Sequence, residues 1–136
     1  MEKTRIGFAM CGSFCTFEPA MEQLHLPAEQ GHKILPIMSK TASETDTRFG
    51  RASDFIWELE DTCHHKVIKT IAEAEPIGPK HLVDLMVVAP CTGNTLAKLS
   101  WGITDTPVTM AVKSSLRIGL PVVLALATND ALAASA

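Results

Sequence analysis

The chain has 136 residues, of which 46% are hydrophobic and 20% are charged, and its formal net charge is −3. This length predicts one domain, residues 1–136, with a core of its own, and the negative net charge argues against a nucleic-acid partner. No apolar stretch is long enough for a membrane span and the N-terminal one is too short for a signal-peptide core, so we expect no membrane partner and a cytoplasmic location.

The first third of the sequence predicts a strand, a helix and a second strand. Arg5–Met10 is largely apolar and runs directly into a turn that contains Gly12. Glu18 and Pro19 then favour a helix start, because proline suits the first helical turn and an acidic side chain suits the positive end of the helix dipole. A second short strand is expected at Lys33–Met38.

The middle of the chain is expected to hold one helix and one strand between two loops. The polar segment 39–50 predicts a loop. Ser53 is a candidate N-cap for a helix that runs through Cys63 with its apolar residues on one face. Lys66–Ile71 predicts a third strand. Glu73–Lys80 contains two prolines and a glycine, which disfavour a regular helix and predict a second loop.

The most apolar strand comes next. Leu85–Ala89 is an unbroken apolar run ended by Pro90, which predicts a strand buried on both faces, as in a parallel sheet. The small polar residues Cys91 to Thr95 predict a tight turn that leads into a helix. Such a turn lies at the carboxyl edge of the sheet, where a helix start offers free amides, so we expect a phosphate or a polar ring at Thr92–Thr95.

The last part of the chain predicts another helix and another strand. Thr106 and Pro107 match an N-cap followed by proline at the first helical position, ahead of an apolar stripe made of Val108, Ala111, Val112 and Leu116. Pro121–Ala127 is apolar and predicts a buried strand. A polar loop at 128–130 and the start of a helix at 131–136 follow, and we expect the sequence to be truncated at its C-terminus.

The order of these elements predicts the fold class. Strands alternate with helices, and the strands are apolar throughout instead of alternating with polar residues. Both features are typical of an α/β three-layer sandwich. We therefore expect a parallel, Rossmann- or flavodoxin-like sheet of about five strands.

Three of the predicted strands are followed by a hydroxyl residue, namely Ser13, Ser39 and Thr92. In a parallel sheet these residues would meet in one crevice and form a seat for a mononucleotide. The alternative is that they only cap helices or stabilise turns. A dinucleotide site is disfavoured, because Gly12 stands alone where a G-x-G-x-x-G fingerprint needs three glycines.

Two cations are candidates for holding the carboxylates of an acidic substrate. Lys98 lies one helical turn beyond the predicted Thr92–Thr95 turn, and Arg48 lies in the loop between Asp46 and Phe49. A guanidinium group suits this role because it can pair with a carboxylate through two parallel hydrogen bonds. The alternatives are a solvated lysine and a surface ion pair. The catalytic residue stays unknown at this point.

The sulfur and imidazole groups predict no metal site. The four cysteines lack CxxC spacing, which predicts reduced thiols and neither a disulfide framework nor a zinc ribbon. His64 and His65 are adjacent, so in a helix they would point to different faces. Cys91 is a candidate thiol nucleophile, but no histidine near it in the sequence would activate it, and packing of a small residue is the alternative.

Several long motifs resemble one family. They are GSFCTF (12–17), DTRFG (46–50), AEPIGPK (74–80), PCTGNTLAKL (90–99) and GITDTPVTMAVK (102–113). In this order they cover nearly the whole chain and closely resemble the family of dipicolinate synthase B subunits. That family is similar to the flavoprotein superfamily of FMN-dependent cysteine decarboxylases and flavin prenyltransferases.

The resemblance implies an FMN site. In the superfamily a P-x-S-A-N-T segment contacts the flavin, and the corresponding segment here is Pro90–Thr95. Cysteine decarboxylases carry a histidine before the central strand, where spacing places Pro76 in this chain, so the resemblance does not extend to that reaction. The cofactor-binding residues implied by the resemblance and the predicted turns are Gly12, Ser13, Phe14, Ser39, Pro90, Thr92, Asn94 and Thr95.

The resemblance also implies an activity and partners. With the A subunit of dipicolinate synthase, the chain would oxidise a dihydrodipicolinate-type dicarboxylate to dipicolinate in the mother cell of a sporulating bacterium. A bound flavin would take up the electrons; alternatively, the A subunit carries NADP and this chain is a non-catalytic binding protein within the complex. A flavin-modifying prenyltransferase is a third alternative. The resemblance further implies a homo-oligomer, either a trimer or a dodecamer.

Overall fold

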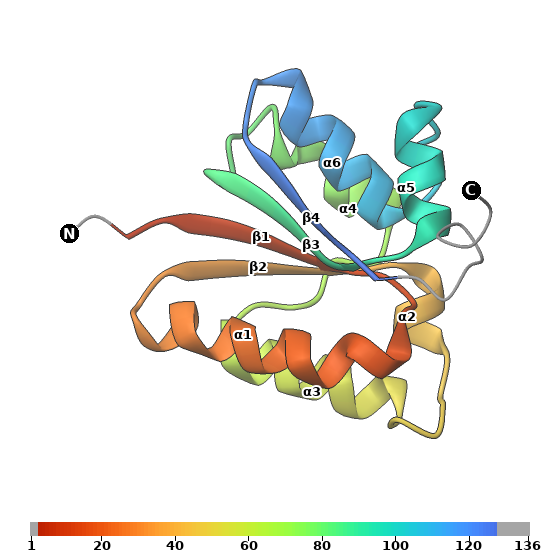
Figure 1. Ribbon diagram of the computed structural model, residues 1–136. Helices are drawn as coiled ribbons and strands as arrows, with labels where there is room; N and C mark the ends of the chain where they lie inside the picture. The colour runs from red at the N-terminus through yellow and green to blue at the C-terminus, as the bar shows by residue number, and fades with distance from the viewer. Residues whose placement is uncertain (1–2, 128–136) are drawn as a thin grey trace.

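The computed structural model describes residues 3–127, so the predicted loop at 128–130 and the helix start at 131–136 lie outside the described residues. The sheet is parallel and has the strand order β2-β1-β3-β4. Helices cover both of its faces (Figure 1), which confirms the predicted α/β sandwich. The strands are β1 (Arg5–Met10), β2 (Lys33–Met38), β3 (Leu85–Cys91) and β4 (Val122–Leu126).

The helices form the two outer layers. On one side of the sheet lie α1 (Phe17–Glu29) and α3 (Ala52–Cys63), with the short α2 (Lys40–Glu44) at the end of β2 (Figure 1). On the other side lie α4 (Ile71–Ala74), α5 (Gly93–Ser100) and α6 (Pro107–Arg117). Two 3₁₀ turns, η1 (Phe14–Thr16) and η2 (Glu75–Ile77), complete the described elements.

Each face of the sheet has its own core, because side chains alternate along a strand. In β1, Phe8 and Met10 pack with α1 and α3, whereas Ala9 packs against α6. In β3, Met86 and Val88 belong to the α6 core. Burial on both faces explains why β1 beyond Arg5 and β3 consist almost entirely of apolar residues.

Four expectations about local structure are wrong. The predicted strand at Lys66–Ile71 is reduced to one bridge, in which Ile68 pairs with Ile37 at the edge of the sheet, so the described sheet has four strands. Residues 40–44, which were predicted to lie in a loop, form the helix α2. The loop predicted to begin at Glu73 instead starts with the end of α4 and the 3₁₀ turn η2. Ser53 lies inside α3, whose first amide, that of Ala52, donates to Asp46 Oδ1 at 2.8 Å.

The last strand and the end of α6 are less buried than their sequences predict. Val123 and Leu126 of β4 are exposed, and among the described residues β4 has β3 as its only strand neighbour. Val108, Ala111 and Val112 are buried as predicted, but Leu116 is 59% exposed. The apolar stripe of α6 therefore extends beyond the core onto the surface.

Candidate functional site

A cavity of about 230 Å³ lies at the carboxyl ends of β1, β2 and β3. This is the edge at which parallel α/β sheets bind ligands, because the connections there turn away to opposite faces. Ser39 follows β2 and Thr92 follows β3, so residues more than fifty positions apart meet here. The cavity is lined by Cys11, Gly12, Ser39, Lys40, Thr41, Thr92, Asn94, Thr95, Lys98 and Thr106.

Ser39 and Thr92 both act as helix N-caps. Ser39 Oγ accepts a hydrogen bond from the amide of Ala42 at 3.1 Å, and Thr92 Oγ1 accepts one from the amide of Thr95 at 3.1 Å. These caps fix where α2 and α5 begin and aim both helix starts at the cavity. In α5 the amides of Gly93 and Asn94 precede the first intrahelical bond, so they are available to an anion.

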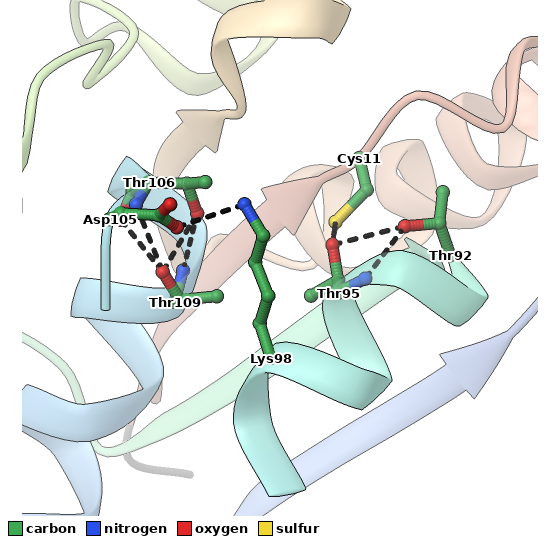
Figure 2. A network of polar contacts seen from close by, with 7 residues as sticks. All are labelled: Cys11, Thr92, Thr95, Lys98, Asp105, Thr106 and Thr109. Atoms are coloured by element: carbon green, nitrogen blue, oxygen red, sulfur yellow. Dashed lines mark hydrogen bonds and ion pairs between the residues drawn. The ribbon is translucent and has the colours of Figure 1, made fainter. Parts of the chain in front are cut away.

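A chain of hydrogen bonds links the start of α5 to the end of β1 (Figure 2). Thr92 Oγ1 donates to Thr95 Oγ1 at 3.0 Å, and Thr95 Oγ1 donates to Cys11 Sγ at 3.2 Å. Burial raises the pKa of the Cys11 thiol, and the hydrogen bonds from Thr95 and Thr92 oppose this effect only in part. Cys11 therefore faces the cavity as a protonated thiol at neutral pH.

The cavity has a positive character. Lys98 Nζ lies 2.9 Å from Asp105 Oδ1, and its side chain is 25% exposed (Figure 2). Lys40 supplies a second ammonium group to the lining. Among the described lining residues none carries a carboxylate or an imidazole. The arrangement can bind a phosphate or a carboxylate, because two cations and a helix start act on the same space.

Thr106 closes the far side of the cavity at the start of α6. Its hydroxyl accepts from the amide of Thr109 at 3.0 Å, and Thr109 Oγ1 accepts from the amide of Thr106 at 3.1 Å. This reciprocal capping box fixes the segment that carries Asp105. The N-cap predicted at Thr106 is confirmed, and the same cap orients the partner of Lys98.

Several expected site residues lie outside the lining of this cavity. The carbonyl of Ser13 accepts from both the amide and the hydroxyl of Thr16, in a turn that leads away from the cavity. Phe14 packs against Phe17, with ring centroids 5.2 Å apart. The carbonyl of Pro90 accepts from the amide of Cys11 at 3.1 Å. The lining of the cavity therefore includes the predicted site residues Gly12, Ser39, Thr92, Asn94, Thr95 and Lys98. Ser13, Phe14 and Pro90 lie outside this lining.

Arg48 also lies outside this cavity. Its guanidinium carbon stands 4.8 Å from the centroid of the Phe49 ring, and both side chains are exposed. The loop is pinned at Asp46, whose carboxylate holds the start of α3. Arg48 is thus a surface residue whose guanidinium group forms no ion pair among the described residues.

Sequence reasoning missed four residues of the lining as ligand contacts. The sequence indicates Cys11 only as a thiol at a strand end and Thr106 only as a cap. Lys40 and Thr41 belong to the short helix α2, which the polar sequence of 39–50 does not indicate. A usable signal is present, because Ser39 directly after a strand is a typical N-cap and places the next two residues at a helix start.

The described part of the chain brings no three His, Cys, Asp or Glu side chains together in a way that could hold a metal ion. None of its helices has the length and apolar character required to cross a bilayer.

Known proteins resemble this chain over nearly its whole length. The dipicolinate synthase B subunit of Bacillus subtilis (strain 168) is 42% identical over 128 residues, which are 94% of this chain and 64% of that protein. The crystal structure of the dipicolinate synthase B subunit from Bacillus halodurans C matches with a TM-score of 0.82 and 40% identity, over 95% of this chain and 66% of that one. The chain thus spans about two thirds of the length of these relatives.

A more distant structure shares the fold. The dodecameric FMN-dependent Ubix-like decarboxylase from Escherichia coli O157:H7 matches with a TM-score of 0.73 and 23% identity, over 90% of this chain and 66% of that one. The family model described as flavoprotein matches residues 1–135. With its parallel sheet and the polar cavity at the carboxyl edge, the chain belongs to the flavoprotein family.

Proposed function

We propose that the chain binds FMN at the cavity between β1, β2 and β3 and serves as the B subunit of a dipicolinate-forming oxidoreductase. The observation that carries the proposal is the meeting of Lys40, Lys98 and the start of α5 around one space. Two ammonium groups and free helix amides favour a phosphate group. The name of the flavoprotein family and the similarity to dipicolinate synthase B subunits support FMN and this activity.

The size of the cavity agrees with one part of FMN. Pockets that enclose a whole ligand occupy roughly 300–1,000 Å³, and this one measures about 230 Å³. It therefore suits the phosphate end, and the ring would extend beyond it. Gly12 supports the fit, because a Cβ there would come within 3.0 Å of Thr41 Cγ2 and narrow the space.

The residues of the cavity have separate roles in this proposal. Lys40, Lys98 and the first amides of α5 would hold the phosphate, while Thr95 fixes the orientation of Cys11 at the inner wall. When bound, the flavin would supply the two-electron acceptor that aromatising a dihydropyridine requires and that side chains cannot provide. Arg48 would pair with a carboxylate of the dicarboxylate substrate from outside the cavity.

Partners belong to the same proposal. Both relatives are named as B subunits, so we propose that this chain also has an A subunit as its partner. The two subunits would bind the dicarboxylate together during sporulation. Self-association into a homo-oligomer is proposed by analogy with the dodecameric decarboxylase. Nicotinamide chemistry, as NADP on the A subunit, would then act in the same complex or replace the flavin.

A second candidate is a non-catalytic binding role within the complex, and two observations favour it. The hydroxyls of Ser39 and Thr92 are already engaged as helix caps, and the described lining offers no carboxylate or imidazole for proton transfer. In that case the cavity would bind a ligand or stabilise the A subunit, and all redox chemistry would belong to the partner.

One experiment separates the two candidates. The full chain is titrated with FMN while the quenching of flavin fluorescence is recorded, and the loaded complex with the A subunit is then assayed for dipicolinate under anaerobic conditions without NADP. Saturable FMN binding, with one equivalent of product formed as the flavin bleaches, supports the oxidoreductase. Absence of FMN binding, with full activity on addition of NADP, supports the non-catalytic role and overturns the flavin proposal.

A further inference from the structure

A groove lies on the helical layer formed by α1 and α3. The two helices run side by side (Figure 1), and His25 Nε2 of α1 lies 3.2 Å from Glu58 Oε1 of α3. Two cavities of about 480 Å³ and 350 Å³ open along this layer. They form one elongated depression, because they share Glu18, Glu22, Phe49 and Phe55. We call this depression the α1/α3 groove.

The α1/α3 groove is acidic. The helix α1 contains three acidic residues and α3 contains four, and neither helix contains a lysine or an arginine. Glu18, Glu22 and Asp54 line the groove and are exposed. Within residues 3–127 none of these three carboxylates forms an ion pair. The groove therefore favours an occupant that carries lysine or arginine side chains and disfavours an acidic one.

An exposed aromatic ring accompanies this charge. Phe49 lines both cavities and is 47% exposed, although it is large and apolar. Its loop is closed by the amides of Thr47 and Gly50, each of which donates to the carbonyl of the other, at 3.0 and 3.1 Å. Asp46 Oδ1 ties the same loop to α3 by accepting from the amide of Ala52. Phe49 is thus held at the groove, where its ring can contact the aliphatic stems of lysine or arginine.

The α1/α3 groove lies close to the polar cavity along the chain. Phe14 lines the smaller of its two cavities and follows Gly12 of the polar cavity by two residues. Phe49 belongs to the connection between β2 and α3, and that connection also carries Lys40 of the polar lining. A protein seated in the groove would therefore contact segments that lead directly into the proposed flavin site.

We propose that the α1/α3 groove is the docking site of the A subunit, which would present a basic segment with apolar side chains beside its cations. This inference rests on the proposed function, because that function requires an A subunit next to the polar cavity. The carboxylates of Glu18, Glu22 and Asp54 would face the cations of the segment, and Phe49 would contact its apolar part. Complementary charge of this kind steers association and selects the partner.

Charge reversal in the groove tests the docking site. In the full chain, Glu22→Lys with Asp54→Lys should bind the immobilised A subunit at least about tenfold more weakly than the parent chain, as measured by surface plasmon resonance. The matched control is Glu29→Lys with Asp61→Lys, which makes the same charge change on the same two helices outside the lining of the groove. This control should bind like the parent chain. Equal affinities for the groove variant and the control would overturn the proposal.

A milder substitution guards against misfolding. Glu22→Gln with Asp54→Asn removes the charges and keeps the size of both side chains, so it should also weaken binding of the A subunit. Circular dichroism and thermal melting check that every variant folds. The affinity of the parent chain should fall as the salt concentration rises, because screening weakens contacts between charges. Binding that is insensitive both to salt and to the neutral variant would contradict an electrostatic contact.

Cross-linking identifies the occupant of the groove. A carbodiimide joins a carboxylate to a lysine amine in contact with it, so mass spectrometry of the treated complex should find Glu18, Glu22 or Asp54 linked to lysines of the A subunit. Links from these residues to lysines of a second copy of this chain would overturn the proposal.

Flavin titration keeps the docking site separate from the proposed function. The groove variant should bind FMN like the parent chain, because neither Glu22 nor Asp54 lines the polar cavity. Loss of binding to the A subunit with FMN binding retained supports docking in the groove. Equal binding of the A subunit by all variants overturns the docking site alone, whereas a parent chain that binds the A subunit but no FMN overturns the flavin proposal alone.

Discussion

Lys98 Nζ and Asp105 Oδ1 are held 2.9 Å apart at the polar cavity, one from α5 and the other from the loop before α6 (Figure 2). Asp105 is the more exposed partner, so water screens the pair and its strength is modest. The carboxylate nevertheless fixes the direction of the ammonium group. An anion that enters the cavity must compete with Asp105 for Lys98.

This competition predicts opposite effects for two substitutions. Lys98→Met should weaken FMN binding at least about tenfold, because it removes a charge-assisted hydrogen bond to the phosphate. Asp105→Asn should strengthen FMN binding, because Lys98 loses its competing partner. Fluorescence titration measures both affinities, and Lys69→Met on the surface is the matched control. Equal affinities for all three variants would remove Lys98 from the flavin site.

Arg48 is predicted to act on the substrate and not on the flavin. Arg48→Ala should raise KM for the dicarboxylate, since a guanidinium pairs with a carboxylate through two hydrogen bonds, and it should leave FMN affinity unchanged. Steady-state kinetics of the complex with the A subunit measures KM. Arg51→Ala, three residues along the same exposed segment, is the control. An unchanged KM would exclude Arg48 from the substrate site.

The sequence predicted the sheet and the place of the cavity for a clear physical reason. Long apolar runs such as Leu85–Ala89 are needed only where both faces of a strand are covered, and parallel strands end at one edge. Once Ser39 and Thr92 were placed directly after strands, their meeting at that edge followed from topology alone. The N-cap at Thr106 was equally accessible, because capping depends on local sequence.

The features that the sequence analysis did not predict depend on packing, which the local sequence does not encode. Ser13 also follows a strand, yet η1 turns the chain at once and carries Ser13 and Phe14 toward α1. Lys66–Ile71 has strand-like residues, but only Ile68 pairs with β2, because the chain leaves the sheet edge to begin α4. Helices as short as α2 give too few residues for a periodic signal.

Thiol chemistry provides a test of the burial pattern. Cys15 is exposed, whereas Cys11 and Cys91 are buried and Cys63 is partly buried. Burial raises the pKa of Cys63 to about 12, and burial followed by the charge of Cys11 raises the pKa of Cys91 to about 11. Only one thiol should therefore react rapidly with iodoacetamide, even at about pH 9, because the thiolate is the reactive form. Peptide mapping should identify this thiol as that of Cys15, and the Cys15→Ser variant should contain no thiol that reacts rapidly with iodoacetamide. Rapid labelling of Cys91 would contradict the structure.

Gly78 is predicted to be intolerant of any side chain. Its amide donates to Ser114 Oγ at 2.6 Å, and a Cβ at this position would collide with the carbonyl group of Ser114 on α6. Gly78→Ala should lower the free energy of unfolding by about 3 kcal/mol, the upper part of the range for overpacking. The matched control is Gly102→Ala, where φ is +71° and an added Cβ would have no atom within 4 Å apart from those of its chain neighbours, so about 1 kcal/mol of backbone strain is expected. Urea denaturation compares the two, and equal losses would mean that this helix contact is misplaced.

Arg5 and Asp84 join the amino ends of β1 and β3, and their contact predicts a pH dependence of stability. The guanidinium of Arg5 donates to Asp84 Oδ1 at 3.0 Å and its amide donates to Oδ2 at 2.8 Å, and these hydrogen bonds lower the pKa of Asp84. A carboxyl group whose pKa is lower in the folded than in the unfolded chain stabilises the fold above the unfolded value, and this contribution disappears as pH falls through the folded value. Asp84→Asn should therefore destabilise the protein near neutral pH, and the difference from the parent chain should shrink below about pH 4. Urea titrations across this range measure the effect, with the exposed Glu44→Gln as control. A difference that stays constant with pH would show that the amide or backbone contacts, and not the charge of Asp84, carry the stabilisation.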